Sequence, residues 1–143
     1  MSGHWINCDA KPHVRQDLKY RKDDQVPGRI RGKILWEKSK AGLWLSRGQG
    51  YGKMIRGATL LDEIKTLEVP VYPVQVFDFL LKNPEQIPNA WKSNDTYFWT
   101  PFYDGTSIVI PFLCWKRESW ISGYKWIGFD WYPRDPAAVQ KPL

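Results

Sequence analysis

The chain has 143 residues, 15% of them aromatic, and a net charge of +6. This length suits one domain, residues 1–143, with a core that needs no metal or disulfide. No stretch approaches the roughly 20 apolar residues of a membrane span, and the N-terminus has no signal-peptide run. We therefore expect a cytoplasmic protein without a membrane partner. Cys8 and Cys114 fit a reducing compartment, and a disulfide between them is the less favoured alternative.

The positive charge is concentrated in the first part of the chain. Residues 1–56 carry 13 Lys and Arg against 5 Asp and Glu, whereas residues 57–143 carry 8 against 10. Such asymmetry indicates a face that meets an acidic partner, of which nucleic acid is the commonest. A solvated basic surface is the alternative. Residues 1–32 lack periodicity and predict an irregular basic arm.

The next segment predicts two strands and a flexible loop. Residues 33–38 and 43–46 favour strands joined by a turn over 39–42, in which Gly42 is free to adopt a positive φ. Residues 47–57, RGQGYGKMIRG, predict a Gly-rich connection.

Two short helices follow. The first covers residues 58–67, with Thr59 as its cap and Asp62 three residues later. The second begins at Pro73 and ends at Asn83, because proline is favoured at a first helical position. Each helix has one apolar face, formed by Leu60, Leu61, Ile64 and Leu67 in the first and by Val74, Phe77, Leu80 and Leu81 in the second.

Residues 97–132 contain thirteen aromatic side chains in 36 positions. Apolar runs at 96–103, 107–116 and 120–131, with a hairpin signal at Asp104–Gly105, predict a three-stranded meander. Pro101 and Pro111 should lie at bulges or direct their missing N–H away from a neighbour. The fold class is therefore α+β, with a mainly antiparallel sheet and two short helices, and residues 133–143 predict a loosely held tail.

Tryptophans of this stretch cannot all share one face of the sheet, because side chains alternate along a strand. Most of the aromatic residues should form the core, and some should remain exposed unless the N-terminal strands cover them. An exposed patch above a few hundred Å² would be an interaction site. The five tryptophans in question are Trp99, Trp115, Trp120, Trp126 and Trp131.

The segment FDFLLKNPEQIPNAWK, followed by LCW, GYKW, DW and PAAV, resembles one family of short bacterial hypothetical proteins. The resemblance runs from about Leu35 to Val139, with a shorter turn at Gly105 and a proline at position 111. It implies a compact fold and an intracellular location. That family has no assigned activity, so the resemblance transfers no site.

The sequence offers weak signals for catalysis, metals or cofactors. His4, Cys8, Asp9 and His13 match no common zinc spacing. The loop 48–54 lacks the Gly-Lys-Ser/Thr of a phosphate-binding loop, since Met54 follows Lys53. No pair of carboxylates stands out as an acid and a base. We expect no cofactor and no metal, with a small enzyme of unknown class as one alternative.

Macromolecular binding is the favoured function. Cations interleaved with flat aromatic rings suit phosphate contact combined with base stacking. The partner is nucleic acid, a nucleoprotein complex or an acidic protein surface; the alternative is an inhibitor or adaptor of a host protein, by analogy with proteins of phage and mobile elements. Packing against the meander is the competing role for Trp36 and Trp44. The candidate binding residues are Arg29, Arg31, Lys33, Trp36, Lys38, Lys40, Trp44, Arg47, Tyr51, Lys53 and Arg56.

Overall fold

One large sheet organises the molecule, for which a computed structural model describes residues 3–142. Within this range the sheet has seven strands in the order β2-β7-β8-β6-β11-β4, and β9 pairs with β8. Its pairs are antiparallel except β6–β11. The strands are β2 (Lys19–Tyr20), β4 (Ala41–Trp44), β6 (Thr96–Tyr97), β7 (Phe102–Asp104), β8 (Ser107–Lys116), β9 (Ser119–Trp126) and β11 (Ala137–Gln140).

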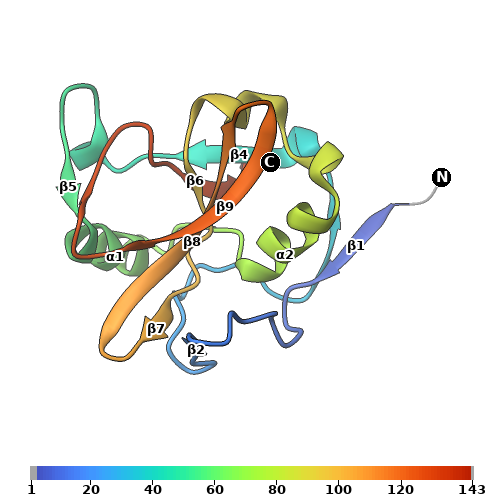
Figure 1. Ribbon diagram of the computed structural model, residues 1–143, viewed down its shortest axis with the longest axis horizontal. Helices are drawn as coiled ribbons and strands as arrows, with labels where there is room; N and C mark the ends of the chain where they lie inside the picture. The colour runs from blue at the N-terminus through green and yellow to red at the C-terminus, as the bar shows by residue number, and fades with distance from the viewer. Residues whose placement is uncertain (1–2, 143) are drawn as a thin grey trace.

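Two helices and two small strand pairs complete the α+β fold, which confirms the predicted class. In Figure 1, α1 and α2 lie on either side of β8. The helices are α1 (Gly57–Thr66) and α2 (Val74–Lys82), with 3₁₀ turns η1 (Lys38–Lys40), η2 (Arg47–Gln49), η3 (Pro84–Gln86) and η4 (Asn89–Ser93). The strand pairs are β1 (His4–Asn7) with β3 (Lys33–Trp36), and β5 (Ile55–Arg56) with β10 (Asp130–Trp131).

The core consists of two hydrophobic clusters, one with each helix. Alternation along the strands divides the aromatic residues between them, because successive side chains point to opposite faces. Phe98 and Leu113 pack with α2, whereas Tyr97, Trp99 and Ile110 pack with α1. The centre of the sheet is therefore covered on both faces.

Periodicity predicts both helices, but the predicted cap of α1 is wrong. The helix begins at Gly57, after Arg56, and no side chain caps it, so Thr59 lies inside the first turn. Gly57 is required because a Cβ there would collide with the carbonyl of Ile127 and the indole nitrogen of Trp131. The second helix begins at Val74, directly after Pro73.

The predicted hairpin over residues 33–46 is wrong. The strand β3 pairs with β1, and β4 pairs with β11, while η1 lies between β3 and β4. These distant pairings bury Trp36 and Ala41, which the local turn signal does not take into account. Gly42 lies within β4, where the Lys141 side chain runs close to its Cα.

The predicted meander is confirmed in β7, β8 and β9, including the turn at Gly105, whose φ is +62°. Tyr97 pairs with Phe112 and Phe102 pairs with Val109, so residues 98–101 oppose only residues 110–111. Pro101 lies in this bulge. The Pro111 carbonyl accepts from the Phe98 N–H at 3.0 Å, so the Pro111 nitrogen, on the same edge of β8, also faces the bulge.

Residues 133–142 are not loosely held, contrary to the prediction for residues 133–143, of which Leu143 lies outside the described residues. The strand β11 lies inside the sheet between β6 and β4, and Ala138 is fully buried. The N-terminal arm is largely irregular over residues 3–32, but β1 and β2 attach it, and Cys8, Leu18 and Val26 are buried. Packing with distant partners therefore holds both terminal segments within residues 3–142.

Candidate nucleic-acid interface

The tryptophans of the aromatic stretch divide into core and surface residues. Trp99 and Trp131 are 1% and 0% exposed, and their ring centroids are 5.0 Å apart. Trp115 and Trp120 are half-buried, and Trp126 is 44% exposed. The prediction that the five tryptophans do not share a face is therefore confirmed: the stretch supplies a core pair and a surface pair.

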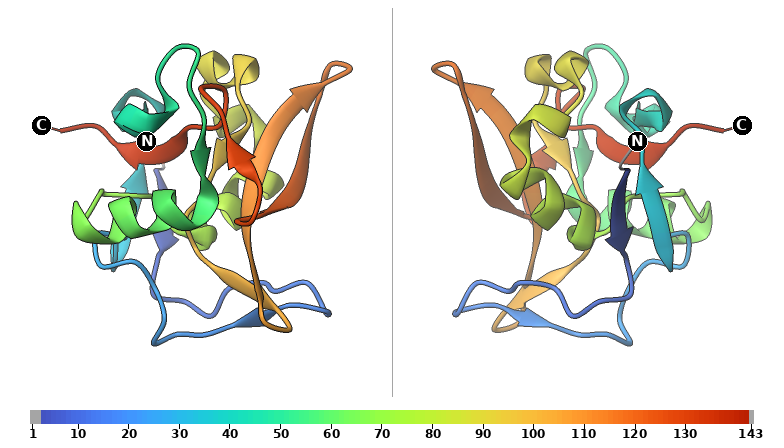
Figure 2. Two further views of the ribbon diagram at one scale, coloured as in Figure 1. Left: turned by 90° about the vertical axis from the view of Figure 1, so that its left-hand side faces the viewer. Right: turned by 90° about the vertical axis from the view of Figure 1, so that its right-hand side faces the viewer.

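The hairpin β8–β9 presents the surface pair near its tip. Its register places Trp115 opposite Trp120, with ring centroids 5.3 Å apart and planes at 66°. The turn beyond them contains Arg117 and Glu118, with φ of +49° and +61°. Figure 2 shows the hairpin extending along one side of the molecule, with its tip away from the sheet centre.

The segment after α2 brings a lysine against this pair. Trp91, 1% exposed, packs against Phe98 and anchors η4 in the core. The next residue, Lys92, is exposed, and its Nζ lies 4.0 Å from the Trp115 ring centroid. A cation over an indole face gains from the ring quadrupole, by roughly 0.5–1 kcal/mol at an exposed site.

Together these elements form a hollow of about 510 Å³, here called the tryptophan groove. Its charged side chains are two lysines and one glutamate. A second hollow, of about 560 Å³, shares Lys38 and Asn89 with it and adds Lys141. The groove is lined by Lys38, Pro84, Glu85, Ile87, Asn89, Lys92, Trp115 and Trp120.

The candidate residues from the sequence do not form one surface. Lys33 lies on β3, beside β1, while Arg56 lies on β5, and Figure 1 shows β1 and β5 at opposite ends of the long axis. Only Lys38 lines the tryptophan groove, and Arg29 lines a different pocket. The exposed members are Arg31, Lys33, Lys38, Lys40, Arg47, Tyr51, Lys53 and Arg56.

The two candidate tryptophans serve packing. Trp36 is 4% exposed, lies 5.2 Å from the Tyr72 ring, and donates from Nε1 to the Gln86 carbonyl at 3.0 Å. It packs beside α2 rather than presenting a face to solvent. Trp44 is half-buried against the cluster of α1. Tyr51, by contrast, is fully exposed.

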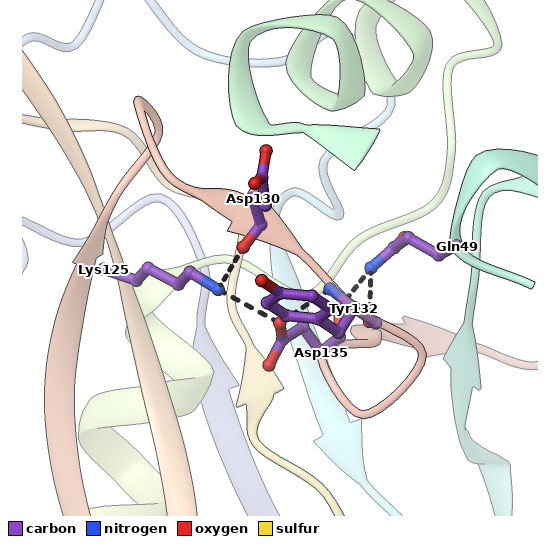
Figure 3. A network of polar contacts seen from close by, with 5 residues as sticks. All are labelled: Gln49, Lys125, Asp130, Tyr132 and Asp135. Atoms are coloured by element: carbon purple, nitrogen blue, oxygen red, sulfur yellow. Dashed lines mark hydrogen bonds and ion pairs between the residues drawn. The ribbon is translucent and has the colours of Figure 1, made fainter. Parts of the chain in front are cut away.

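A polar network beneath β9 explains how this strand is held (Figure 3). Lys125 Nζ lies 3.1 Å from Asp135 Oδ2 and donates to the Asp130 carbonyl at 2.8 Å. Asp135 also accepts from the Tyr132 N–H, and Gln49 donates to the carbonyls of Tyr132 and Asp135. Because these buried groups satisfy one another, the network is structural.

A hollow of about 360 Å³ beside α2 is the nearest approach to a catalytic site, and His13 and Asp78 line it. Burial raises the pKa of Asp78, and the hydrogen bond from the His13 backbone N–H, at 3.0 Å, opposes the rise. The lining holds no Ser, Thr or Cys in the part of the chain that the structure describes. Asp78 thus ties the arm to α2 through the hydrogen bond from His13.

Metal and thiol chemistry find no support in residues 3–142. No group of three or more His, Cys, Asp or Glu within this range could hold a metal ion. Cys8 and Cys114 are free and buried. Burial raises the pKa of Cys8 to about 12, with a further contribution from Asp9, so its thiol stays protonated at neutral pH.

Sequence reasoning missed Lys92 and Lys141 and placed Trp115 and Trp120 only in a general pool of aromatic residues. The short turn could have predicted the tryptophan pair. Only two residues separate Lys116 from Ser119, and a two-residue turn sets a register in which Trp115 lies opposite Trp120. The contact of Lys92 with Trp115 depends on η4 and has no such local signal.

Comparisons with known proteins return no match among family models, curated proteins or solved structures. Between residues 3 and 142, neither helix has the length and apolar character needed to cross a bilayer. The site must therefore be interpreted from its own chemistry.

Proposed function

We propose that this protein is a non-enzymatic binder of single-stranded nucleic acid, which it holds in the tryptophan groove. The observation that carries the proposal is the half-buried Trp115–Trp120 pair in a hollow whose cations are Lys38 and Lys92. Nucleic-acid bases stack on aromatic rings whatever their sequence, with roughly 1–3 kcal/mol per base. Lysines beside the stack neutralise the flanking phosphates.

Electrostatics favour a polyanion over a neutral partner. The whole chain carries +6, which raises the encounter rate with nucleic acid at low salt. Lys38, Lys92 and Lys141 line the two adjoining hollows, against Glu85 as the sole acid in their linings. Three phosphate contacts on a single strand predict a slope of log K against log salt of about −2.

Fluorescence anisotropy with a labelled oligothymidine of about 15 nucleotides tests the proposal. Trp120→Ala should weaken binding by about 5- to 150-fold, the equivalent of one stacked base. Lys92→Gln should make the salt slope less steep by about 0.7. Trp126→Ala is the matched control, because Trp126 is exposed on the same strand and outside the groove.

Three results would each refute a part of the proposal: the location of the interface, stacking in the groove, or nucleic-acid binding itself. If Arg31→Gln with Lys33→Gln weakens binding more than Lys38→Gln with Lys92→Gln, the interface lies at β3 and the groove is refuted. If Trp126→Ala matches Trp120→Ala, stacking in the groove is refuted. If the oligonucleotide does not bind at low salt, nucleic-acid binding itself is refuted.

A protein partner is the second candidate, and the edge of β9 favours it. Within the described residues β9 pairs only with β8, so eight residues have a free outer edge. Ile121 and Trp126 on this strand are 42% and 44% exposed. A strand from a partner protein could add here through main-chain hydrogen bonds. Such binding would depend weakly on salt, whereas nucleic-acid binding in the groove would depend on it strongly.

A further inference from the structure

A second basic pocket lies apart from the tryptophan groove and shares no lining residue with it. Its volume is about 440 Å³, within the range of roughly 300–1,000 Å³ for small-molecule sites. Three cationic side chains and one carboxylate line it. The basic pocket consists of Cys8, Asp9, Ala10, Lys11, Tyr20, Lys22 and Arg29.

Arg29 is held in place by its backbone. It ends a turn in which its N–H donates to the Val26 carbonyl at 3.2 Å, and the next N–H, of Ile30, donates to the Val71 carbonyl at 3.0 Å. Gly28 packs so closely on the chain at Glu68 that any Cβ would collide with its carbonyl. This turn therefore cannot move away from the body of the protein without breaking these contacts.

The Arg29 side chain has an unused donor. Its Nε is buried and makes no hydrogen bond to any described residue. A buried donor without a partner is unfavourable by roughly 1–3 kcal/mol, and more when charged. The guanidinium charge also lacks a counter-ion among the described residues, and an anion in the adjoining pocket would neutralise it.

The segment that contains Tyr20 and Lys22 is also held by contacts with the rest of the protein. Tyr20 pairs with Phe102 in the sheet. Arg21 stacks on Tyr103 at 3.9 Å, and the Tyr103 hydroxyl donates to Asp24. With Arg21 engaged there, Tyr20 and Lys22 are the two residues of this segment that line the pocket.

The remaining polar groups leave the pocket positive and chemically inert. Asp9 Oδ2 accepts from the Gly32 N–H at 3.1 Å, and Asp9 is the one acidic residue in the lining against three cations. The Cys8 thiol is 1% exposed and offers no nucleophile at neutral pH. The lining residues whose side chains carry hydrogen-bond donors for a ligand are Lys11, Tyr20, Lys22 and Arg29.

We propose that the basic pocket binds the phosphate group of a small ligand, with Arg29 and Lys22 as the principal contacts. Arg presents a planar fork that matches phosphate oxygens, while Lys supplies a mobile point charge. The volume exceeds that of one phosphate, so the ligand is a diphosphate or a phosphate ester such as a nucleotide. This inference does not depend on nucleic-acid binding in the groove.

Isothermal titration calorimetry of the full chain with pyrophosphate, adenosine diphosphate and adenosine tests the inference. Pyrophosphate and the nucleotide should bind with one site each, and adenosine should not bind. Arg29→Gln should weaken binding by about 10-fold or more, since a hydrogen bond to a charged group has that effect. Lys22→Gln, an exposed residue, should weaken it by several-fold without a risk to folding.

The controls locate the site. Arg31→Gln removes the same charge two residues away, outside the pocket, and should leave both affinities within 2-fold. Trp120→Ala should also leave them unchanged, which separates this pocket from the groove. A 5′-phosphorylated oligonucleotide that competes with pyrophosphate where its unphosphorylated form does not would identify a nucleic-acid end as the source of the phosphate.

Three results would overturn the inference. Absence of pyrophosphate and nucleotide binding at low salt excludes the site. Equal losses from Arg31→Gln and Lys22→Gln would show diffuse attraction to a basic surface. Adenosine that binds as tightly as the diphosphate would show that phosphate is not what the pocket recognises.

Discussion

Two tryptophan pairs with similar local chemistry have opposite fates in this molecule. Trp99 and Trp131 are fully buried, and Lys125 Nζ lies 4.8 Å from the Trp131 ring. Trp115 and Trp120 are half-buried, and Lys92 Nζ lies 4.0 Å from the Trp115 ring. Each pair thus has one lysine over an indole. The difference is what else surrounds them: α1 and a satisfied polar network cover the first, while a groove opens beside the second.

An aromatic pair with a cation is therefore not by itself a binding site. The Lys125 ammonium is engaged by Asp135 and the Asp130 carbonyl, so its charge is already balanced within the protein. Lys92 forms no ion pair with a described residue. Under the proposed function, the second pair is therefore the one that would meet a polyanion.

The largest expected effect is the loss of a buried indole. Trp131→Ala should lower the free energy of unfolding by about 3–5 kcal/mol, because it opens a cavity in the cluster of α1. Trp120→Ala should lower it by only about 1 kcal/mol, since much of its surface is already hydrated. Urea unfolding followed by circular dichroism measures both, and equal losses would contradict the division into core and surface pairs.

Replacement of Lys125 should destabilise the protein more than replacement of Lys92, as for the two tryptophans. Lys125→Met leaves the Asp135 carboxylate, 2% exposed, without its counter-ion, and should lower stability by about 3–5 kcal/mol. Lys92→Met should lower it by less than about 1 kcal/mol. The double variant Lys125→Met with Asp135→Asn should recover part of the loss, because no unpaired charge remains. A double variant no more stable than the single one would show that charge pairing is not the cause.

The turn next to the surface pair offers a gain of stability. Arg117 and Glu118 both have positive φ, a conformation that disfavours L-residues by roughly 1–2 kcal/mol each. Arg117→Asn with Glu118→Gly supplies the residues that this hairpin turn prefers and should raise the free energy of unfolding by about 1–2 kcal/mol. Thermal unfolding measures the gain in stability, and fluorescence anisotropy measures the oligonucleotide affinity of the same variant. An unchanged affinity would show that the backbone strain of this turn has no role in binding.

The smallest expected effect is a change in the pH dependence of stability, caused by Asp95. Burial, and then the nearby Asp135, raise the pKa of Asp95 in the folded protein. The folded state therefore binds the Asp95 proton more readily than the unfolded state, so this group lowers stability as the pH rises through its folded pKa.

Asp95→Asn should thus stabilise the protein slightly at about pH 7, and the advantage should shrink toward about pH 4, where the carboxyl is protonated. Urea unfolding of both proteins at the two pH values measures it. An advantage that grows as the pH falls would contradict the assigned direction of the pKa.

Local sequence rules were sufficient for the elements whose partners are close in the chain. Apolar periodicity determined α1 and α2, and the Asp104–Gly105 turn with alternating aromatic residues determined the β7–β8–β9 meander. The two prolines likewise predicted their bulge, because a missing N–H cannot join a ladder of hydrogen bonds. Strand parity also showed that the tryptophans must divide between faces.

Only the tertiary structure decided the pairings between distant segments. The β1–β3 and β4–β11 pairs bury Trp36 and Ala138. They form in place of the predicted local hairpin, and the predicted loose tail becomes an inner strand of the sheet. The contact of Lys92 with Trp115 and the pocket around Arg29 depend on the same long-range packing. The sequence alone shows which residues are charged or aromatic. Which of them come into contact depends on the free energy of burial summed over the whole chain.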